Sequence, residues 1–257
     1  MFHVKRLHMI EKEVHMDRSL FIENCLELFQ LNTLPCTGQQ AERLFLLTER
    51  MLEVNKTMNL TAITDPQAII LRHYVDSITI SEYIPEGAGV LDVGCGAGFP
   101  TLPLAIFRPD LTITALDGTA KRVRYVEETA QLLGLSNVCP IAGRAEELAH
   151  APDFRERFDV VTARAVASLP VLCELCLGFV RVGGTMIAMK AQQATRELED
   201  ACTCIKTCGG AEPSRTERFL VAPDVDDECR NLIFISKTAH TSKIFPRHFS
   251  KISKKPL

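Results

Sequence analysis

Between residues 89 and 190 short apolar runs alternate with longer helical segments, and this alternation constrains the fold more than any other feature of the chain. Strands joined by helices of about ten or more residues pair in parallel, so we predict an α/β fold with a doubly wound, mostly parallel sheet. Two later runs, 217–221 and 231–237, are separated only by a loop, which indicates an antiparallel edge. The predicted parallel strands are residues 89–94, 111–117, 137–143, 158–165 and 184–190.

The segment before this alternation carries apolar side chains at helical spacing. The predicted helices are residues 19–31, 39–55 and 66–81. Asp65 is the expected N-cap of the third helix, because Pro66 follows it in the first turn. Gly87 and Gly89 mark a break, whereas the first fifteen residues match no clear element and Met16 is an alternative start. We therefore divide the chain into a helical region (1–88), a core (89–236) and a tail (237–257).

Composition fits a globular protein. Hydrophobic residues make up 46% of the 257, yet no apolar run reaches the roughly 18 residues of a membrane span. The N-terminus has no apolar signal segment, so a cytoplasmic protein without a membrane partner is expected.

Ten scattered cysteines favour free thiols, and Cys173 and Cys176 are expected to be buried in an apolar helix. Neither they nor Cys202, Cys204 and Cys208 have the second ligand pair of a zinc site, so no metal is predicted.

Charge is unevenly distributed along the chain. Residues 237–257 contain six Lys or Arg and no acid, which leaves the other 236 residues with 23 basic and 32 acidic side chains, a net charge of −9. A basic tail on an acidic body points to a polyanionic partner, although a solvated terminus has the same composition. The aromatic residues Phe245 and Phe249 favour binding. The tail cations expected to contact this polyanion are Lys243, Arg247, Lys251, Lys254 and Lys255.

A glycine-rich turn, DVGCGAGF over residues 92–99, closes the first predicted strand and opens a helix. Glycines there let a ligand approach the backbone and the N–H groups of the helix start. The dinucleotide pattern G-x-G-x-x-G fails in both registers, because its last position falls on Phe99 or Thr101. The acid-x-G-x-G-x-G that remains resembles motif I of S-adenosylmethionine-dependent methyltransferases. Asp117, at the end of the second strand, would then accept the ribose hydroxyls, whereas a tight structural turn is the alternative.

Further strings narrow the resemblance to one family. In chain order they are NKTMNLTAI (55–63), RHYVDSI (72–78), LDVGCGAGFPTLPLA (91–105), LDGTAKRVRYVEE (116–128), GRAEEL (143–148) and FDVVTARAVASL (158–169). Together with the basic tail, they resemble the RsmG family, also called glucose-inhibited division protein B, over nearly all of residues 18–257. The chain departs from the family pattern at Cys95, Thr101, Ser250 and Ile252.

The resemblance implies a class I methyltransferase fold, a helical N-terminal region and S-adenosylmethionine as cofactor. It implies methylation of a guanine N7 in the 530 loop of 16S ribosomal RNA, with the small subunit or an assembly intermediate as partner and no protein partner evident. Phe99 would be an apolar wall, and Thr119 or its neighbouring backbone would cap the next helix. Arg164 enters the crevice after an apolar strand, where an unpaired buried charge is costly. The cofactor contacts carried over are Gly94, Phe99, Asp117, Gly118, Thr119, Ala145, Glu146 and Arg164.

No general base is assigned. Enzymes that methylate exocyclic amines usually carry an (N/D)-P-P-(Y/F) loop after the fourth strand, but residues 162–166 read TARAV. A ring nitrogen such as N7 has a free lone pair, so positioning supplies most of the catalysis. His73 and Asp76 are either a catalytic pair or, as we favour, a contact that fixes the helical region against the sheet. The alternatives are a small-molecule methyltransferase and an RNA-binding assembly factor that binds S-adenosylmethionine without turnover.

Overall fold

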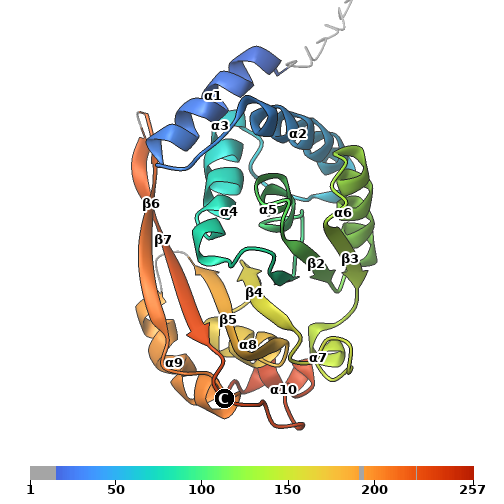
Figure 1. Cartoon of the computed structure of the whole chain (residues 1–257), viewed down its shortest axis with the longest axis vertical. Coiled ribbons are helices and arrows are strands. Elements are labelled where there is room, and N and C mark those ends of the chain that lie inside the picture. Colours follow the sequence, from blue (N-terminus) through green and yellow to red (C-terminus); the bar gives the residue numbers. More distant parts are fainter. Residues whose placement is uncertain (1–15, 191–193, 224) are drawn as a thin grey trace, which may run out of the picture.

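The computed structural model describes residues 16–190, 194–223 and 225–257, and it contains a seven-stranded sheet in the order β3-β2-β1-β4-β5-β7-β6 (Figure 1). Strands β1 to β5 are parallel, and β7 runs antiparallel to both β5 and β6. The predicted fold class is confirmed. The strands are β1 (Gly89–Val93), β2 (Thr112–Asp117), β3 (Val138–Ala142), β4 (Phe158–Arg164), β5 (Val180–Lys190), β6 (Ser214–Ala222) and β7 (Val225–Ser236).

The last three strands are longer than predicted. Strand β5 begins at Val180 rather than at Gly184, so Gly183 also lies within it. The pairing of β4 with β5 is irregular at this point, and a side chain at Gly184 would lie 2.6 Å from the Asp159 carbonyl oxygen. The additional residues of β6 and β7 are largely polar or charged, so they lie outside the apolar runs on which the prediction was based. They still pair with each other, and such side chains are tolerated because the hairpin at the edge of the sheet is partly exposed.

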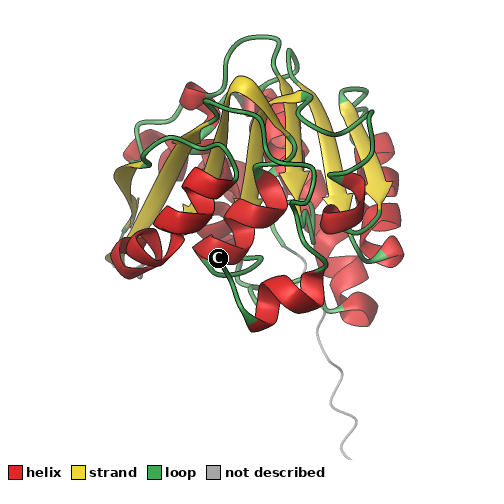
Figure 2. Ribbon diagram, turned by 90° about the horizontal axis from the view of Figure 1, so that it is seen from below, coloured by secondary structure: helices red, strands yellow, loops and turns green. Residues whose placement is uncertain are grey.

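Helices cover both faces of the sheet (Figure 2). The segments are α1 (Arg18–Leu31), α2 (Gly38–Met58), α3 (Pro66–Ile69), a π-helix (Ile70–Val75), α4 (Asp76–Ile78), a 3₁₀ turn (Ser81–Tyr83), α5 (Thr101–Phe107), α6 (Ala120–Leu132), α7 (Ala145–Leu148), α8 (Leu169–Cys176), α9 (Ala194–Thr207) and α10 (Phe249–Lys254). Asp65 accepts a hydrogen bond from the Ala68 N–H, which confirms it as an N-cap. The predicted helix 66–81 runs as far as Ile78 and has a π-turn in its middle.

Two hydrophobic clusters lie on opposite faces of the sheet, because neighbouring strand residues point to opposite sides. Val90 and Val160 join the cluster that contains the helical region, α5 and α6. Leu91 and Val161 join the other cluster, which contains α8, α9 and parts of the tail. The helical region therefore shares a core with the sheet. The boundaries at residues 88 and 236 remain predictions.

A side chain of the helical region also pairs with the edge of the sheet. Asn32, the C-cap of α1, donates to the Val221 carbonyl at 2.8 Å and accepts from the Val221 N–H at 2.9 Å. The amide thus replaces a neighbouring strand for one residue of β6 and covers part of an edge that would otherwise stay open.

The tail packs against the body through two buried charges. Lys237 is 1% exposed, and its Nζ donates to the carbonyls of Leu177 and Cys208 at 2.8 Å each. Arg247 forms a paired contact with the fully buried Glu174, with Nε–Oε1 at 2.8 Å and Nη2–Oε2 at 2.6 Å. The tail is therefore an ordered element, and Arg247, expected to contact RNA, has its guanidinium committed to an internal ion pair.

Other expectations concern the cysteines, metals and membranes. All ten cysteines are free, and Cys173 and Cys176 are buried as predicted. Within the described residues no group of three or more His, Cys, Asp or Glu side chains is placed to hold a metal ion. Among the helices of the same residues, none has the length and apolar character needed to cross a membrane. The first fifteen residues, which include the proposed segment before Met16, lie outside the described part.

The Arg247–Glu174 pair gives the first prediction. Arg247→Ala leaves the Glu174 carboxylate buried without its cation, which should lower the free energy of unfolding by about 3–5 kcal/mol. Urea denaturation measures this change. Lys251→Ala, at an exposed position of the same tail, is the control and should change stability by less than about 0.5 kcal/mol. Equal stability of the two variants would contradict the anchoring role.

Candidate functional site

The glycine turn lies where β1 ends, at the carboxyl edge of the parallel strands. The N–H groups of Gly94 and Cys95 both donate to the Leu116 carbonyl, at 2.7 and 3.0 Å, so the turn is fastened to β2. Gly94 has φ +77°, and a Cβ there would lie 2.6 Å from a methyl of Val166. Gly96 has φ +55°, and the nearest atom to a Cβ there is 3.8 Å away, so the backbone faces open space. A ligand can approach this turn closely, as a motif I turn requires.

Asp117 holds the turn from the end of β2. Its Oδ2 accepts the Gly96 N–H at 3.0 Å, and its Oδ1 accepts the Thr119 N–H at 2.7 Å. Each carboxylate oxygen keeps a lone pair, so the side chain can still accept the two ribose hydroxyls that the sequence assigns to it. Gly118 and Thr119 are exposed beside it. Thr119 is the N-cap residue of α6, but its hydroxyl makes no capping bond, and its N–H is held by Asp117 instead.

Asp92, the acid of the glycine motif, is 1% exposed and faces two hydroxyl donors. Thr101 donates to Oδ2 at 2.7 Å from α5, and Thr162 donates to Oδ1 at 3.1 Å from β4. Burial raises the pKa of Asp92 to about 6. Thr101, one of the departures from the family pattern, therefore supplies a hydrogen bond to the motif acid. Asp92 ties the helix after the turn to two strands.

Ala145 and Glu146, two of the predicted cofactor contacts, lie at the start of α7. Glu146 is 7% exposed and pairs with Arg144, Nε to Oε1 at 3.1 Å, and Ala145 precedes it in the helix. The Arg144 guanidinium lies 5.0 Å from the centre of the Phe249 ring. A Cβ added to Gly118 would lie 3.4 Å from the same guanidinium. The tail helix α10 therefore reaches the cofactor side of the molecule through one cation–π contact.

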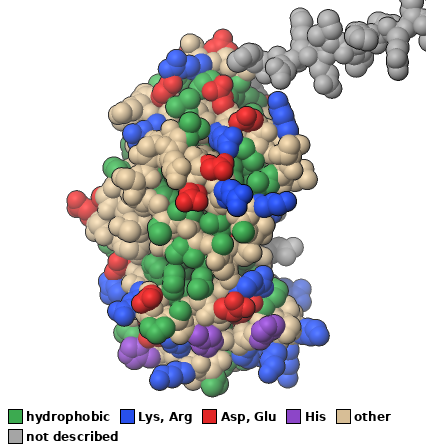
Figure 3. Space-filling view, turned by 90° about the vertical axis from the view of Figure 1, so that its right-hand side faces the viewer, with side chains coloured by type: hydrophobic (Ala, Val, Ile, Leu, Met, Phe, Trp, Pro, Cys, Tyr) green, Lys and Arg blue, Asp and Glu red, His purple; other side chains and the backbone are tan. Residues whose placement is uncertain are grey.

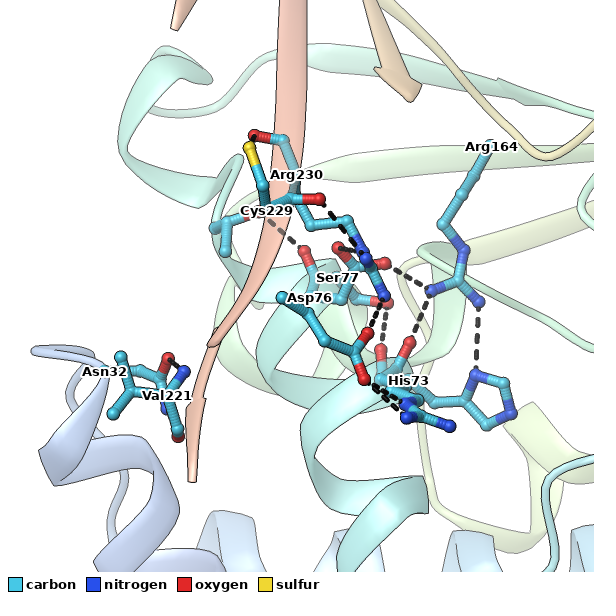
Figure 4. Close-up of polar contacts among 11 residues, drawn as sticks. Asn32, His73, Asp76, Ser77, Arg164, Val221, Cys229 and Arg230 are labelled. Carbon is cyan, nitrogen blue, oxygen red and sulfur yellow. Dashed lines mark hydrogen bonds and ion pairs between the residues drawn. The ribbon is translucent and has the colours of Figure 1, made fainter. Parts of the chain in front are cut away.

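Arg164, His73 and Asp76 form one cluster in the structure (Figure 4). From the sequence, Arg164 was predicted to enter the crevice, and two alternative roles were open for His73 and Asp76. Arg164 Nη1 donates to Asp76 Oδ2 at 2.8 Å, and Nη2 lies 3.5 Å from His73 Nδ1. The guanidinium lies over the Phe99 ring at 5.2 Å, and His73 stacks on the same ring at 4.5 Å. This contact fixes the helical region to the end of β4, as favoured from the sequence.

Arg230 of β7 is a member of this cluster that sequence reasoning missed. Its Nε lies 3.4 Å from Asp76 Oδ1, and its Nη2 lies 2.7 Å from Glu228, which also pairs with Arg72 at 2.5 Å (Figure 4). A signal was present, since Arg230 stands immediately before the apolar run of the last strand. Asp76 is about 150 residues away in sequence, so no local pattern identifies it as the partner of Arg230.

His73 is neutral in this cluster. Burial, followed by the positive charge of Arg164, lowers the pKa of His73 to about 3. Its Nε2 lies 2.9 Å from the Thr61 hydroxyl. Both ring nitrogens and the Asp76 carboxylate therefore already have partners within the protein.

A family model described as rRNA small subunit methyltransferase G matches residues 40–219. The chain belongs to this family. Ribosomal RNA small subunit methyltransferase G of Acetivibrio thermocellus is 40% identical over 250 residues, covering 97% of this chain and 100% of the relative. The enzyme of the same name from Lactobacillus delbrueckii subsp. bulgaricus is 39% identical over 246 residues, with 94% and 100% covered.

Among solved structures, a Pyrococcus horikoshii protein described as a transferase has a TM-score of 0.51 at 14% identity and covers 63% of both chains, a likeness of fold alone. Membership of the methyltransferase G family confirms the predicted class, an S-adenosylmethionine-dependent rRNA methyltransferase. The glycine turn, the open face at Gly96 and the free lone pairs of Asp117 fit that cofactor. The individual cofactor contacts stay predictions, and they are those assigned to Gly94, Phe99, Asp117, Gly118, Thr119, Ala145, Glu146 and Arg164.

Asp117 gives a prediction about the cofactor. Asp117→Ala should weaken binding of S-adenosylmethionine by roughly 1.5–3 kcal/mol, because a charge-assisted acceptor and the fastening of the turn are both lost. Isothermal titration calorimetry measures the affinity. Arg122→Gln is the control, since it removes the cation 3.9 Å from Asp117 without touching the turn. An unchanged affinity in Asp117→Ala would remove this residue from the site.

Asp92 gives a prediction about pH. Its folded-state pKa of about 6 lies above the value near 4 of an unfolded chain, so the native state keeps a proton that the unfolded state releases. This contribution to stability is present below about pH 4 and is lost as the pH rises through about 6. Urea denaturation at about pH 4 and pH 7 should therefore show that the unmodified protein loses roughly 2–3 kcal/mol relative to Asp92→Asn. Parallel pH profiles of the two proteins would contradict this assignment.

Proposed function

We propose that this protein transfers the methyl group of S-adenosylmethionine to N7 of a guanine in 16S ribosomal RNA, in the 530 loop that the family resemblance implies. One observation carries the choice of N7. The candidate pair beside the crevice is engaged within the protein: His73 Nε2 lies 2.9 Å from the Thr61 hydroxyl, and Asp76 accepts from Arg164 on Oδ2 with Arg230 3.4 Å from Oδ1. An exocyclic amine must lose a proton to become methylated, whereas N7 attacks with a free lone pair and needs no base.

The cofactor supplies an electrophilic methyl group, and the chain's task is then to hold and orient both reactants. Asp117 and the glycine turn would bind the cofactor. Arg164 would act by position, because its ion pair with Asp76 and its contact with Phe99 fix the end of β4 beside the turn.

The test uses small subunits from a strain that lacks this modification. Incubation with the protein and labelled S-adenosylmethionine should label 16S RNA at one guanine, and chain cleavage specific for N7-methylguanine should map it to the 530 loop. Label on another ring position or another RNA would overturn the assignment. Label only on small molecules favours the small-molecule enzyme, and binding of both ligands without label favours the assembly factor.

The tail lysines give a prediction about RNA affinity. Lys251, Lys254 and Lys255 are exposed on or beside α10, whereas Arg247 is an internal partner and must be kept. Changing the three lysines to Gln should reduce the salt slope of log K for 16S RNA by about 2–3, since each phosphate contact contributes about 0.7–0.9. S-adenosylmethionine affinity should stay unchanged, because Phe249 and Arg144 remain in contact. An unaltered slope would exclude α10 as an RNA contact and leave the helical region as the better candidate.

A further inference from the structure

A pocket of about 560 Å³ opens at the edge of the sheet where the parallel strands begin, opposite the edge that carries the glycine turn. One wall is the segment that leads into β4, and the other comes from the tail after β7. In the space-filling view, Lys, Arg and His side chains, with some Asp and Glu among them, lie at the lower end of the molecule, where Figure 1 shows the C terminus and α10 (Figure 3). The lining residues are His150, Pro152, Arg155, Glu156, Arg157, Val182, His240 and Lys243.

The pocket carries an uncompensated positive charge. Arg155, Arg157 and Lys243 have no carboxylate partner among the described residues, whereas Glu156 is the one acid in the lining. Glu156 lies 3.4 Å from the buried Lys237 ammonium and 2.5 Å from His240 Nδ1. Burial would raise the pKa of Glu156, but its hydrogen bonds to His240 and the Thr241 N–H hold it below its usual value. The Glu156 carboxylate therefore balances the Lys237 ammonium, and the charges of Arg155, Arg157 and Lys243 remain unbalanced at the pocket.

The geometry of the pocket is fixed before any ligand arrives. Arg155 donates from Nη1 to the carbonyls of Ala149 and Phe245, at 2.9 and 3.1 Å, which joins the two walls. Its Nη2 donates to the carbonyls of Thr241 and Ser242 in the tail, at 2.7 and 3.1 Å. Arg155 thus contributes charge from a rigid position. Arg157 and Lys243 are exposed, and although Arg157 Nε donates to the Pro152 carbonyl at 3.2 Å, its terminal nitrogens and the Lys243 ammonium face solvent as donors. A tetrahedral oxyanion is the ligand that such a group of donors suits.

The distance between the pocket and the methyl-transfer site distinguishes a free phosphate from a phosphate of the RNA backbone. Strand β4 separates the two edges, and its seven residues span about 20 Å at roughly 3.3 Å each. A free phosphate bound so far away has no role in the transfer, whereas an RNA that extends from the target guanine reaches it. Phosphate contacts of this kind set the orientation of a nucleic acid without reading its sequence.

We propose that this pocket, built from Arg155, Arg157 and Lys243, binds a backbone phosphate of the RNA substrate about 20 Å from the methylated guanine. The inference rests on the proposed function, and it adds that the substrate must be an extended RNA, as in a ribosomal particle or long transcript. A short hairpin around the target would occupy the catalytic edge alone.

The test compares two double variants on two substrates. Arg157→Gln with Lys243→Gln should raise KM for small subunits severalfold and reduce the salt slope of their binding by about 1–2. Methylation of a short hairpin that carries the target guanine should not change. Arg157→Lys with Lys243→Arg keeps both charges and should restore binding. Both variants keep Arg155, so the tail stays docked, and an unchanged melting temperature checks this.

Any of three results with the variants would overturn the proposal: an unchanged salt slope for small subunits, an equal loss on the hairpin, or a loss on particles that is absent with protein-free 16S RNA. The last result would point to an acidic ribosomal protein. Saturation of the pocket by inorganic phosphate, with RNA binding unaffected, would assign it to a free anion and also contradict the inference. The salt slope is measured on binding itself, so it tests the pocket even where no methylation is detected, whereas absence of methylation would refute the proposed function.

Discussion

One buried carboxylate, that of Asp76, holds together the parts of the chain that form the site. It lies at the junction of the helical region with the sheet and is 5% exposed, with Arg164 of β4 on one oxygen and Arg230 of β7 near the other. A carboxylate at this depth is stable only beside cations, so the helical region, β4 and β7 must meet there. Phe99 and His73 then stack beside Arg164, which joins the glycine turn to the same cluster.

Two further acids organise the carboxyl edge of the sheet by accepting hydrogen bonds. Asp117 takes the N–H groups of Gly96 and Thr119, and Asp92 takes the hydroxyls of Thr101 and Thr162. Their acceptor atoms fix the turn before a cofactor binds, so the cofactor does not have to order the loop itself. Preorganisation of this kind is how an enzyme that relies on positioning, rather than on a base, gains rate.

At the opposite end, buried charges fasten the tail so that its remaining cations become a fixed surface. Lys237 and Arg247 bind partners inside the protein. The exposed tail cations are Lys243, Lys251, Lys254 and Lys255. The tail is therefore more than a charged extension, because its aromatic Phe249 also rests on Arg144 beside the cofactor edge. The exposed tail lysines and Phe249 therefore belong to one docked segment.

The sequence by itself determined the alternation of strands and helices, the glycine turn, Asp117 at the end of β2 and the N-cap at Asp65. These features depend on neighbouring residues, and local backbone preferences specify them directly. Only the tertiary structure decided that Arg164 pairs with Asp76, that Arg230 joins them and that Arg247 pairs with Glu174 rather than solvent. Each of these pairs spans more than 70 residues, and a charge chooses its partner by burial and distance in space, which no local pattern encodes.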